Sequence, residues 1–122
     1  MTEAQGQHTG PQPLRASPHL ESAFEVLGRK WNAVIIDVLA QRPARFGELR
    51  AAVAGISDRM LSGRLRELVD AGLVTHTRLP PGPTAYAVTA DGKALALALG
   101  QVCAWSQRRT AMPACAESGT GH

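Results

Sequence analysis

The chain has 122 residues, a formal net charge of +3 and two cysteines. This length suits one domain, and two cysteines cannot build a disulfide framework. The sequence has no apolar run as long as a membrane span, and its first residues lack the basic start and apolar stretch of a signal peptide. We therefore expect a reduced, cytoplasmic protein.

Both ends of the chain are predicted to be flexible tails. Residues 1–16 and 109–122 contain few large apolar side chains. Such segments cannot bury enough surface to offset the entropy lost on ordering. The folded unit is therefore predicted over residues 17–108.

Two helices are predicted at the start of this unit. Ser17 followed by Pro18 is a helix start signal, and apolar residues then recur at helical spacing as far as Gly28. A second helix is predicted over residues 30–41, because the helix must stop before Pro43. Its inward face is predicted to consist of Trp31, Val34, Ile35, Ile36, Val38 and Leu39.

A closely spaced helix pair is predicted next. Residues 44–46 are expected to form a minor strand and residues 46–53 a short helix. After a tight turn, Ser57 is a strong cap for a helix over residues 58–71, which Gly72 closes. This arrangement is typical of a helix-turn-helix.

A hairpin and a last helix complete the pattern. Residues 73–79 and 84–88 read as strands, joined by a proline-rich turn at 80–83. Thr89 then caps a helix predicted to end near residue 108. The order of elements predicts an α+β, mainly α, winged helix-turn-helix fold.

The helix over 58–71 has the two faces of a DNA recognition helix. Leu61, Leu65, Leu68 and Val69 are predicted to form its buried stripe. The opposite side presents Arg59, Gly63 and Arg66, with Ser62 at the edge. Arginine binds guanine in the major groove with two hydrogen bonds, and glycine permits close backbone approach. An ordinary solvated helix face is the competing interpretation, but the neighbouring helix and hairpin favour DNA.

Other polar residues near this helix suit phosphate contacts. Ser57 at the helix N-terminus, Arg45 and Arg78 are the candidates. Residues 42–68 contain six arginines against three acidic residues, which concentrates a charge of +3 there. The hairpin tip lacks basic residues, so we expect it to contribute shape and phosphate contact rather than base readout.

Several blocks of sequence carry a family resemblance. They are residues 27–31, 45–50, 55–61, 65–68, 72–74 and 86–92. In this order and spacing they closely resemble the HxlR-type family of winged-helix transcription regulators, over about residues 18–107. The resemblance implies a homodimer formed by the first and last helices, a recognition helix at 57–71 and a wing at 75–88.

The implied dimer predicts both an interface and a target. Its contact residues would be Leu20, Phe24, Leu95, Leu99, Val102 and Trp105. The target would be double-stranded DNA with a pseudo-palindromic operator, and repression is the expected outcome. Many members of the family carry a cysteine before the first helix, whereas this chain has Ser17 there, which excludes thiol sensing at that position.

Three alternatives remain open at this stage. Cys103 is either a small core residue or a redox or electrophile sensor, and Trp31 is either a core anchor or part of an effector site. A small-molecule effector is compatible with the sensor interpretation of Cys103 and with the effector-site interpretation of Trp31. A protein-interaction module without DNA binding is the alternative function, which the neutral wing favours. We find no metal-ligand spacing, cofactor motif or catalytic arrangement, and therefore expect no metal, no cofactor and no enzyme.

Overall fold

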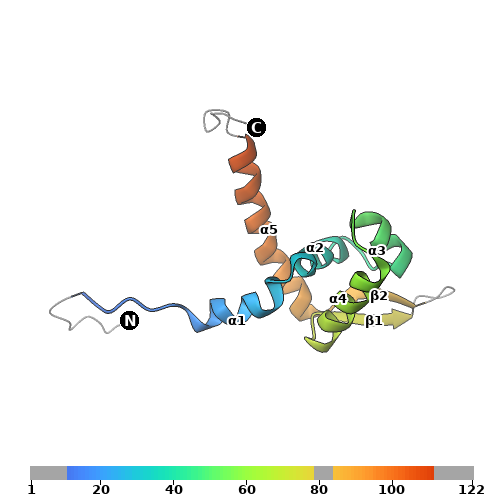
Figure 1. Ribbon diagram of the computed structural model, residues 1–122, viewed down its shortest axis with the longest axis horizontal. Coiled ribbons are helices and arrows are strands. Elements are labelled where there is room, and N and C mark those ends of the chain that lie inside the picture. The colour runs from blue at the N-terminus through green and yellow to red at the C-terminus, as the bar shows by residue number, and fades with distance from the viewer. Residues whose placement is uncertain (1–10, 79–83, 112–122) are drawn as a thin grey trace.

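The computed structural model describes residues 11–78 and 84–111. Its elements are α1 (Pro18–Leu27), α2 (Lys30–Leu39), α3 (Phe46–Ala52), α4 (Asp58–Asp70), β1 (Val74–Arg78), β2 (Thr84–Val88) and α5 (Ala90–Ala111). The body consists of α2, α3, α4 and the hairpin, while α1 and the C-terminal half of α5 project from it (Figure 1). This architecture confirms the predicted α+β, mainly α, fold.

The helices begin where their capping residues predict. The hydroxyl groups of Ser17 and Ser57 each accept a hydrogen bond from a backbone N–H in the first turn of α1 and α4. Thr89 Oγ1 accepts a hydrogen bond from the Gly92 N–H at 3.0 Å and donates one to the Gly72 carbonyl oxygen at 2.7 Å. Thr89 therefore joins the start of α5 to the end of α4. Gly72 has a φ of 80°, the left-handed conformation that suits a residue after a helix.

Several boundaries differ from the sequence prediction; α2, for example, ends at Leu39 rather than at residue 41. The expected strand over 44–46 is only an isolated antiparallel bridge between Ala44 and Tyr86. Phe46 is already the first residue of α3, so the chain turns into a helix before a strand can extend. At the other end, α5 continues to Ala111, three residues beyond the expected end near 108. The predicted turn at 80–83 lies outside the described residues.

The hairpin is a regular antiparallel pair. Its register places Val74 opposite Val88 and His76 opposite Tyr86. Ala44 adds two backbone hydrogen bonds to Tyr86, at 2.8 and 3.0 Å. Tyr86 is therefore held from both sides, by β1 and by the segment before α3.

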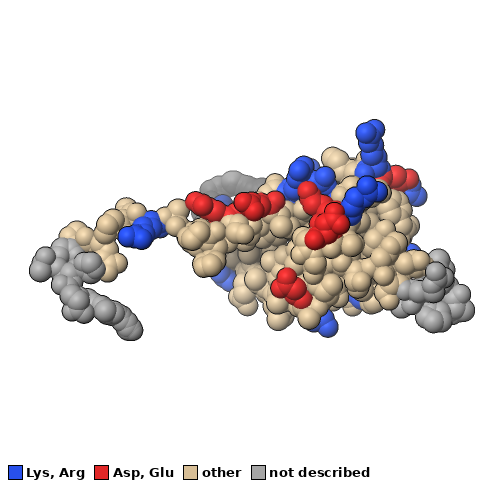
Figure 2. All heavy atoms as spheres, turned by 90° about the horizontal axis from the view of Figure 1, so that it is seen from below, with Lys and Arg blue, Asp and Glu red and all other residues tan. Residues whose placement is uncertain are grey.

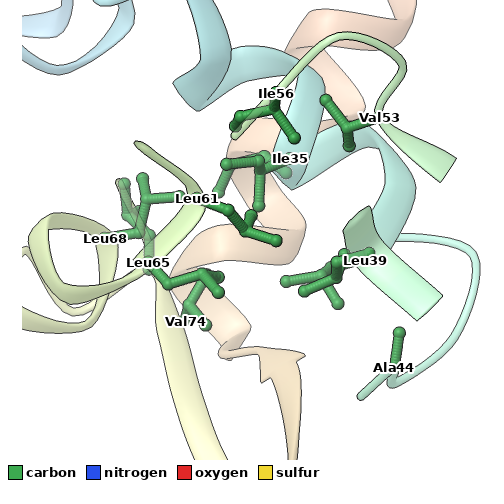
Figure 3. Packing of buried hydrophobic residues seen from close by; sticks show 12 residues of the cluster. Ile35, Leu39, Ala44, Val53, Ile56, Leu61, Leu65, Leu68 and Val74 are labelled. Carbon is green, nitrogen blue, oxygen red and sulfur yellow. The ribbon is translucent and has the colours of Figure 1, made fainter. Parts of the chain in front are cut away.

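The core lies between α2, α4 and the hairpin. Its largest fully buried side chains include Ile35, Leu39, Leu61, Leu65, Leu68 and Val74, which point toward one another in Figure 3. The leucines of α4 form the predicted inward stripe, so the opposite side of this helix must face outward. None of the described helices is both long and apolar enough to cross a membrane.

Two residues assigned to inward faces are instead exposed. Val69 is 37% exposed and borders a hollow between α4 and the hairpin. The contact of α4 with the body is therefore narrower than the predicted stripe. Val34 is 41% exposed and lies in a groove that α2 forms with α5. The polar Asn32, by contrast, is fully buried on the same helix as Val34.

We predict that Leu65→Ala destabilises the fold, because it leaves a cavity in the middle of this core. The expected loss in the free energy of unfolding is about 2–5 kcal/mol, measured by urea denaturation. The matched control is Met60→Ala on the exposed side of the same helix, which should cost less than about 1 kcal/mol. Equal losses for both variants would contradict the burial of one side of α4.

Candidate nucleic-acid interface

The outward side of α4 is built as the sequence predicted. Arg59, Ser62, Gly63 and Arg66 are all exposed, while Leu61 on the opposite side is fully buried. A Cβ atom added to Gly63 would meet nothing within 4 Å, so the packing of the chain itself does not require glycine there. The free space leaves room for a partner to approach the helix backbone.

The six arginines of residues 42–68 divide into two sets. Three form ion pairs: Arg42 with Glu48 at 3.1 Å, Arg50 with Asp58 at 3.0 Å, and Arg64 with Glu67 at 3.4 Å. The other three, Arg45, Arg59 and Arg66, form no ion pair with any described residue. Since the three acidic residues of this segment are all paired, its net charge of +3 belongs to these three arginines.

Figure 2 shows the same mixture on one face of the molecule. Most of the basic side chains visible in this view lie on the body, where several of them are beside acidic ones, and a basic side chain also lies on the N-terminal arm. An exposed ion pair of this kind adds little to stability, but it neutralises the charge that a phosphate would otherwise meet. The unpaired arginines are therefore the strongest candidates for contact with an anionic partner.

Arg45 is placed by the start of α3. The Glu48 carboxylate accepts a hydrogen bond from the Arg45 backbone N–H at 2.9 Å and also binds the Arg42 guanidinium. The hydrogen bond from Arg42, together with that from the Arg45 N–H, lowers the pKa of Glu48. The Glu48 carboxylate thus holds the backbone of Arg45 at the start of α3, from which the Arg45 side chain extends.

A partly buried polar network around Asn32 holds α4 against the first two helices. Asn32 Nδ2 donates to the Val26 carbonyl oxygen at 2.8 Å and to Glu67 Oε1 at 3.1 Å. Glu67 is also approached by Arg29 at 3.5 Å and by Arg64 at 3.4 Å. These bonds connect the end of α1 and the start of α2 to the third turn of α4. The sequence signal for this network is an asparagine within an apolar helix face, which hydrophobic periodicity alone does not identify.

The remaining predicted DNA contacts lie around this face. Ser57 is the exposed N-cap of α4, and its hydroxyl accepts a hydrogen bond from the Met60 N–H at 3.1 Å. Arg78 ends β1, next to the turn outside the described residues, and its side chain lies outside them as well. The ion pair between Arg50 and Asp58 ties the start of α4 to α3.

The predicted dimer residues fall into two groups. Leu20, Phe24, Val102 and Trp105 are largely exposed on α1 and α5. Leu95 and Leu99 are half-buried because they pack against the chain's own core. Leu97, which is not among the predicted contacts, is 75% exposed. The projecting helices therefore carry large apolar side chains that this chain alone does not cover.

The two sensor candidates differ in their surroundings. Trp31 is half-buried against the core, with the Lys30 ammonium 4.7 Å from its ring centroid. Cys103 is exposed in this chain, so it does not belong to the chain's own core. It lies in the groove between α2 and α5, beside Val34. Within residues 11–78 and 84–111, no group of three or more histidine, cysteine or acidic side chains is arranged to hold a metal ion.

Comparison with known proteins identifies the family. Residues 26–113 match the protein-family model described as HxlR-like helix-turn-helix. The chain belongs to this family. The resemblance found in the sequence is thereby confirmed, and with it the general class of helix-turn-helix transcriptional regulators.

One relative and its solved structures illustrate the match. The HTH-type transcriptional regulator YodB of Bacillus subtilis is 39% identical over 93 residues, which cover 75% of this HxlR-like chain and 83% of YodB. The reduced form of YodB superposes with a TM-score of 0.67 at 38% identity, covering 77% of this chain and 94% of that one. The quinone-bound form of YodB gives a TM-score of 0.66 at 36% identity, covering 75% and 99%.

We predict that Asn32→Asp destabilises the fold, because it places a second carboxylate against Glu67 and removes the donor to Val26. An unpaired buried charge costs about 3–5 kcal/mol, so the loss in unfolding free energy should be of that order at neutral pH. Since burial raises the pKa of such a carboxyl, the loss should shrink as the pH falls and the new side chain is protonated. The exposed control Gln41→Glu adds the same charge and should change stability by less than about 0.5 kcal/mol. A pH-independent loss would contradict the network.

Proposed function

We propose that this HxlR-like chain is a dimeric, sequence-specific DNA-binding transcriptional regulator. In this proposal α4 enters the major groove, and the hairpin lies against the DNA backbone or the minor groove. The observation that carries the proposal is the division of the arginines. Among the six arginines of residues 42–68, the three without an ion pair to any described residue are on the exposed side of α4 and at the start of α3.

Each exposed residue has a role in this proposal. Arg59 and Arg66 read base edges, because a guanidinium can bind O6 and N7 of guanine together. Ser62 and Gly63 lie between them in sequence, within reach of the same groove. Arg45, Ser57 and Arg78 hold phosphates and set the position of the helix on the duplex.

The apolar side chains of α1 and α5 support the dimer. A soluble protein rarely leaves a continuous apolar surface uncovered, and a second copy is the partner we propose. Two α4 helices would then enter successive major grooves about 34–36 Å apart, which requires a pseudo-palindromic operator. We propose repression as the outcome, because a dimer that occupies a promoter blocks access by occupancy alone.

We also propose that DNA binding responds to a small molecule, a proposal supported by the similarity of this chain to YodB, which has a quinone-bound structure. This chain has Ser17 before α1, so a thiol that senses an effector must come from another position. Cys103 is the exposed thiol among the described residues, and Trp31 is an aromatic side chain in the first turn of α2. An effector changes the affinity for DNA only if it binds the two dimer geometries unequally.

The first test is fluorescence anisotropy with the DNA upstream of the chain's own gene and with scrambled DNA of equal length, over a salt series. A preference of about 10³-fold or more for the upstream DNA is expected of a specific regulator. The affinity should also fall steeply with salt, because each phosphate contact releases counterions.

We predict that Arg66→Ala and Arg59→Ala each weaken specific binding by about 1–3 kcal/mol and reduce the preference for the operator. The matched control is Arg108→Ala, which removes the same charge from the exposed far end of α5 and should leave the preference unchanged. Unchanged operator affinity of the Arg66 variant would refute the assignment of this residue to base readout.

We predict that Val102→Asp converts the dimer to a monomer, because it places a charge in the proposed apolar interface. Light scattering coupled to gel filtration measures the mass directly. Met60→Asp introduces the same charge at an exposed apolar position on α4 and should remain dimeric. If the wild-type chain is monomeric throughout the micromolar range, the proposed dimer is wrong.

The second candidate function is a winged-helix module that binds protein rather than DNA. The observation in its favour is the proline-rich hairpin tip, which lacks the basic residues of a typical wing. Absence of binding to either DNA at low salt would favour this candidate. A steep dependence of DNA affinity on salt would exclude it as the main function.

A further inference from the structure

A hollow between α4 and the hairpin combines groups that suit a phosphate. We name it the α4–hairpin hollow, and its lining consists of Ser62, Leu65, Arg66, Val69, His76 and Tyr86. The α4 side supplies a hydroxyl and a guanidinium, and the hairpin side supplies an imidazole and a phenol. No carboxylate belongs to this lining among the described residues.

His76 is held in this hollow by its neighbour on β2. The rings of His76 and Tyr86 are stacked, with centroids 4.2 Å apart and planes 10° from parallel. The two residues face each other in the strand register, and Tyr86 is bonded on its other side to Ala44. A stacked imidazole keeps both ring nitrogens free along its edge. The side chain is exposed, and neither nitrogen forms a hydrogen bond with any described residue.

We propose that the α4–hairpin hollow is a DNA phosphate site in which His76 contacts the backbone as a cation beside Arg66. This inference rests on the proposed function, because α4 in the major groove brings the flanking DNA strand past the hairpin. Ser62 and Arg66 belong both to the outward side of α4 and to the hollow, so a strand that meets α4 also meets His76. The basic residue missing from the hairpin tip is thereby replaced by one in the middle of β1.

The arrangement couples DNA binding to proton uptake. The charged and titratable groups that line the hollow with His76 are Arg66 and Tyr86. A phosphate that contacts His76 favours the imidazolium, because a nearby opposite charge stabilises the charged form. Histidine is the side chain that changes charge between about pH 5 and pH 8, so the coupling falls in a measurable range.

The test compares the wild type with His76→Gln and His76→Lys on a labelled duplex selected by the protein from a random pool. At about pH 6 the wild type should bind on the order of tenfold more tightly than His76→Gln, the size of one charge-assisted hydrogen bond, and this advantage should vanish near pH 8. His76→Lys carries its charge at both pH values and should bind tightly at both. The salt slope at the lower pH should be smaller by about 1 per protomer in His76→Gln.

Controls separate this inference from the proposed function. His19→Gln removes an exposed histidine from α1 and should keep the wild-type pH dependence. Suppose that the wild type binds DNA with a steep salt slope, but that the affinity of His76→Gln depends on pH as strongly as that of the wild type. The proposed phosphate site is then wrong, and the proposed function stands. If the wild type binds no duplex at any pH, both fail. If the His76 ring resonances respond to millimolar inorganic phosphate but not to the duplex, the hollow is a free-anion site, and the inference is overturned.

Circular dichroism of each variant verifies that the hairpin is intact. If His76→Gln fails to fold, Tyr86→Leu provides the second route, because it removes the stacking partner and leaves the imidazole in place. A mobile imidazole is a weaker phosphate ligand, so the pH dependence should become shallower than in the wild type. An unchanged pH dependence in Tyr86→Leu would show that the stacked pair does not position His76.

Discussion

The constraint on which the rest of the structure depends is the two-sided anchoring of α4. Leu61, Leu65 and Leu68 bury one side of the helix in the core. Glu67 then ties it to the buried Asn32 and to Arg29, at the junction between the first two helices. Hydrophobic burial alone fixes which side faces inward, but it is non-directional. The directional hydrogen bonds of this network set the rotation and position of the helix, and hence the direction of its exposed arginines.

The same acidic residues that organise the helices also select which arginines are free. Asp58 and Glu67 belong to α4 itself, and Glu48 caps the start of α3. Glu48 and Asp58 each hold one guanidinium in place, and Glu67 holds two. The positive charge that remains is therefore presented by residues with defined positions, rather than spread along a mobile surface. Such pre-positioning lowers the entropy lost when a charged partner binds.

The distribution of apolar surface separates two regions of the chain. The body, with its closed core, carries the proposed DNA face, and the projecting helices α1 and α5 carry exposed apolar side chains (Figure 1). The two regions meet where Asn32 contacts the Val26 carbonyl at the end of α1. A change in the position of α1 would therefore act on α4 through a short chain of hydrogen bonds. This connection is a physical route by which a change at the proposed dimer interface reaches the proposed recognition helix.

The sequence by itself determined the order of the elements, the helix caps and the inward leucines of α4, because these depend on local backbone preferences and on hydrophobic periodicity. Capping by Ser17, Ser57 and Thr89 needs only residues within the next turn. Only the tertiary structure decided which arginines are paired, that Asn32 is buried and that His76 stacks on Tyr86 beside Arg66. Most of these contacts join residues far apart in the chain, and even the close pairs depend on how the helices and strands pack. No periodicity encodes such contacts, because they arise only when separate elements are brought together around one core.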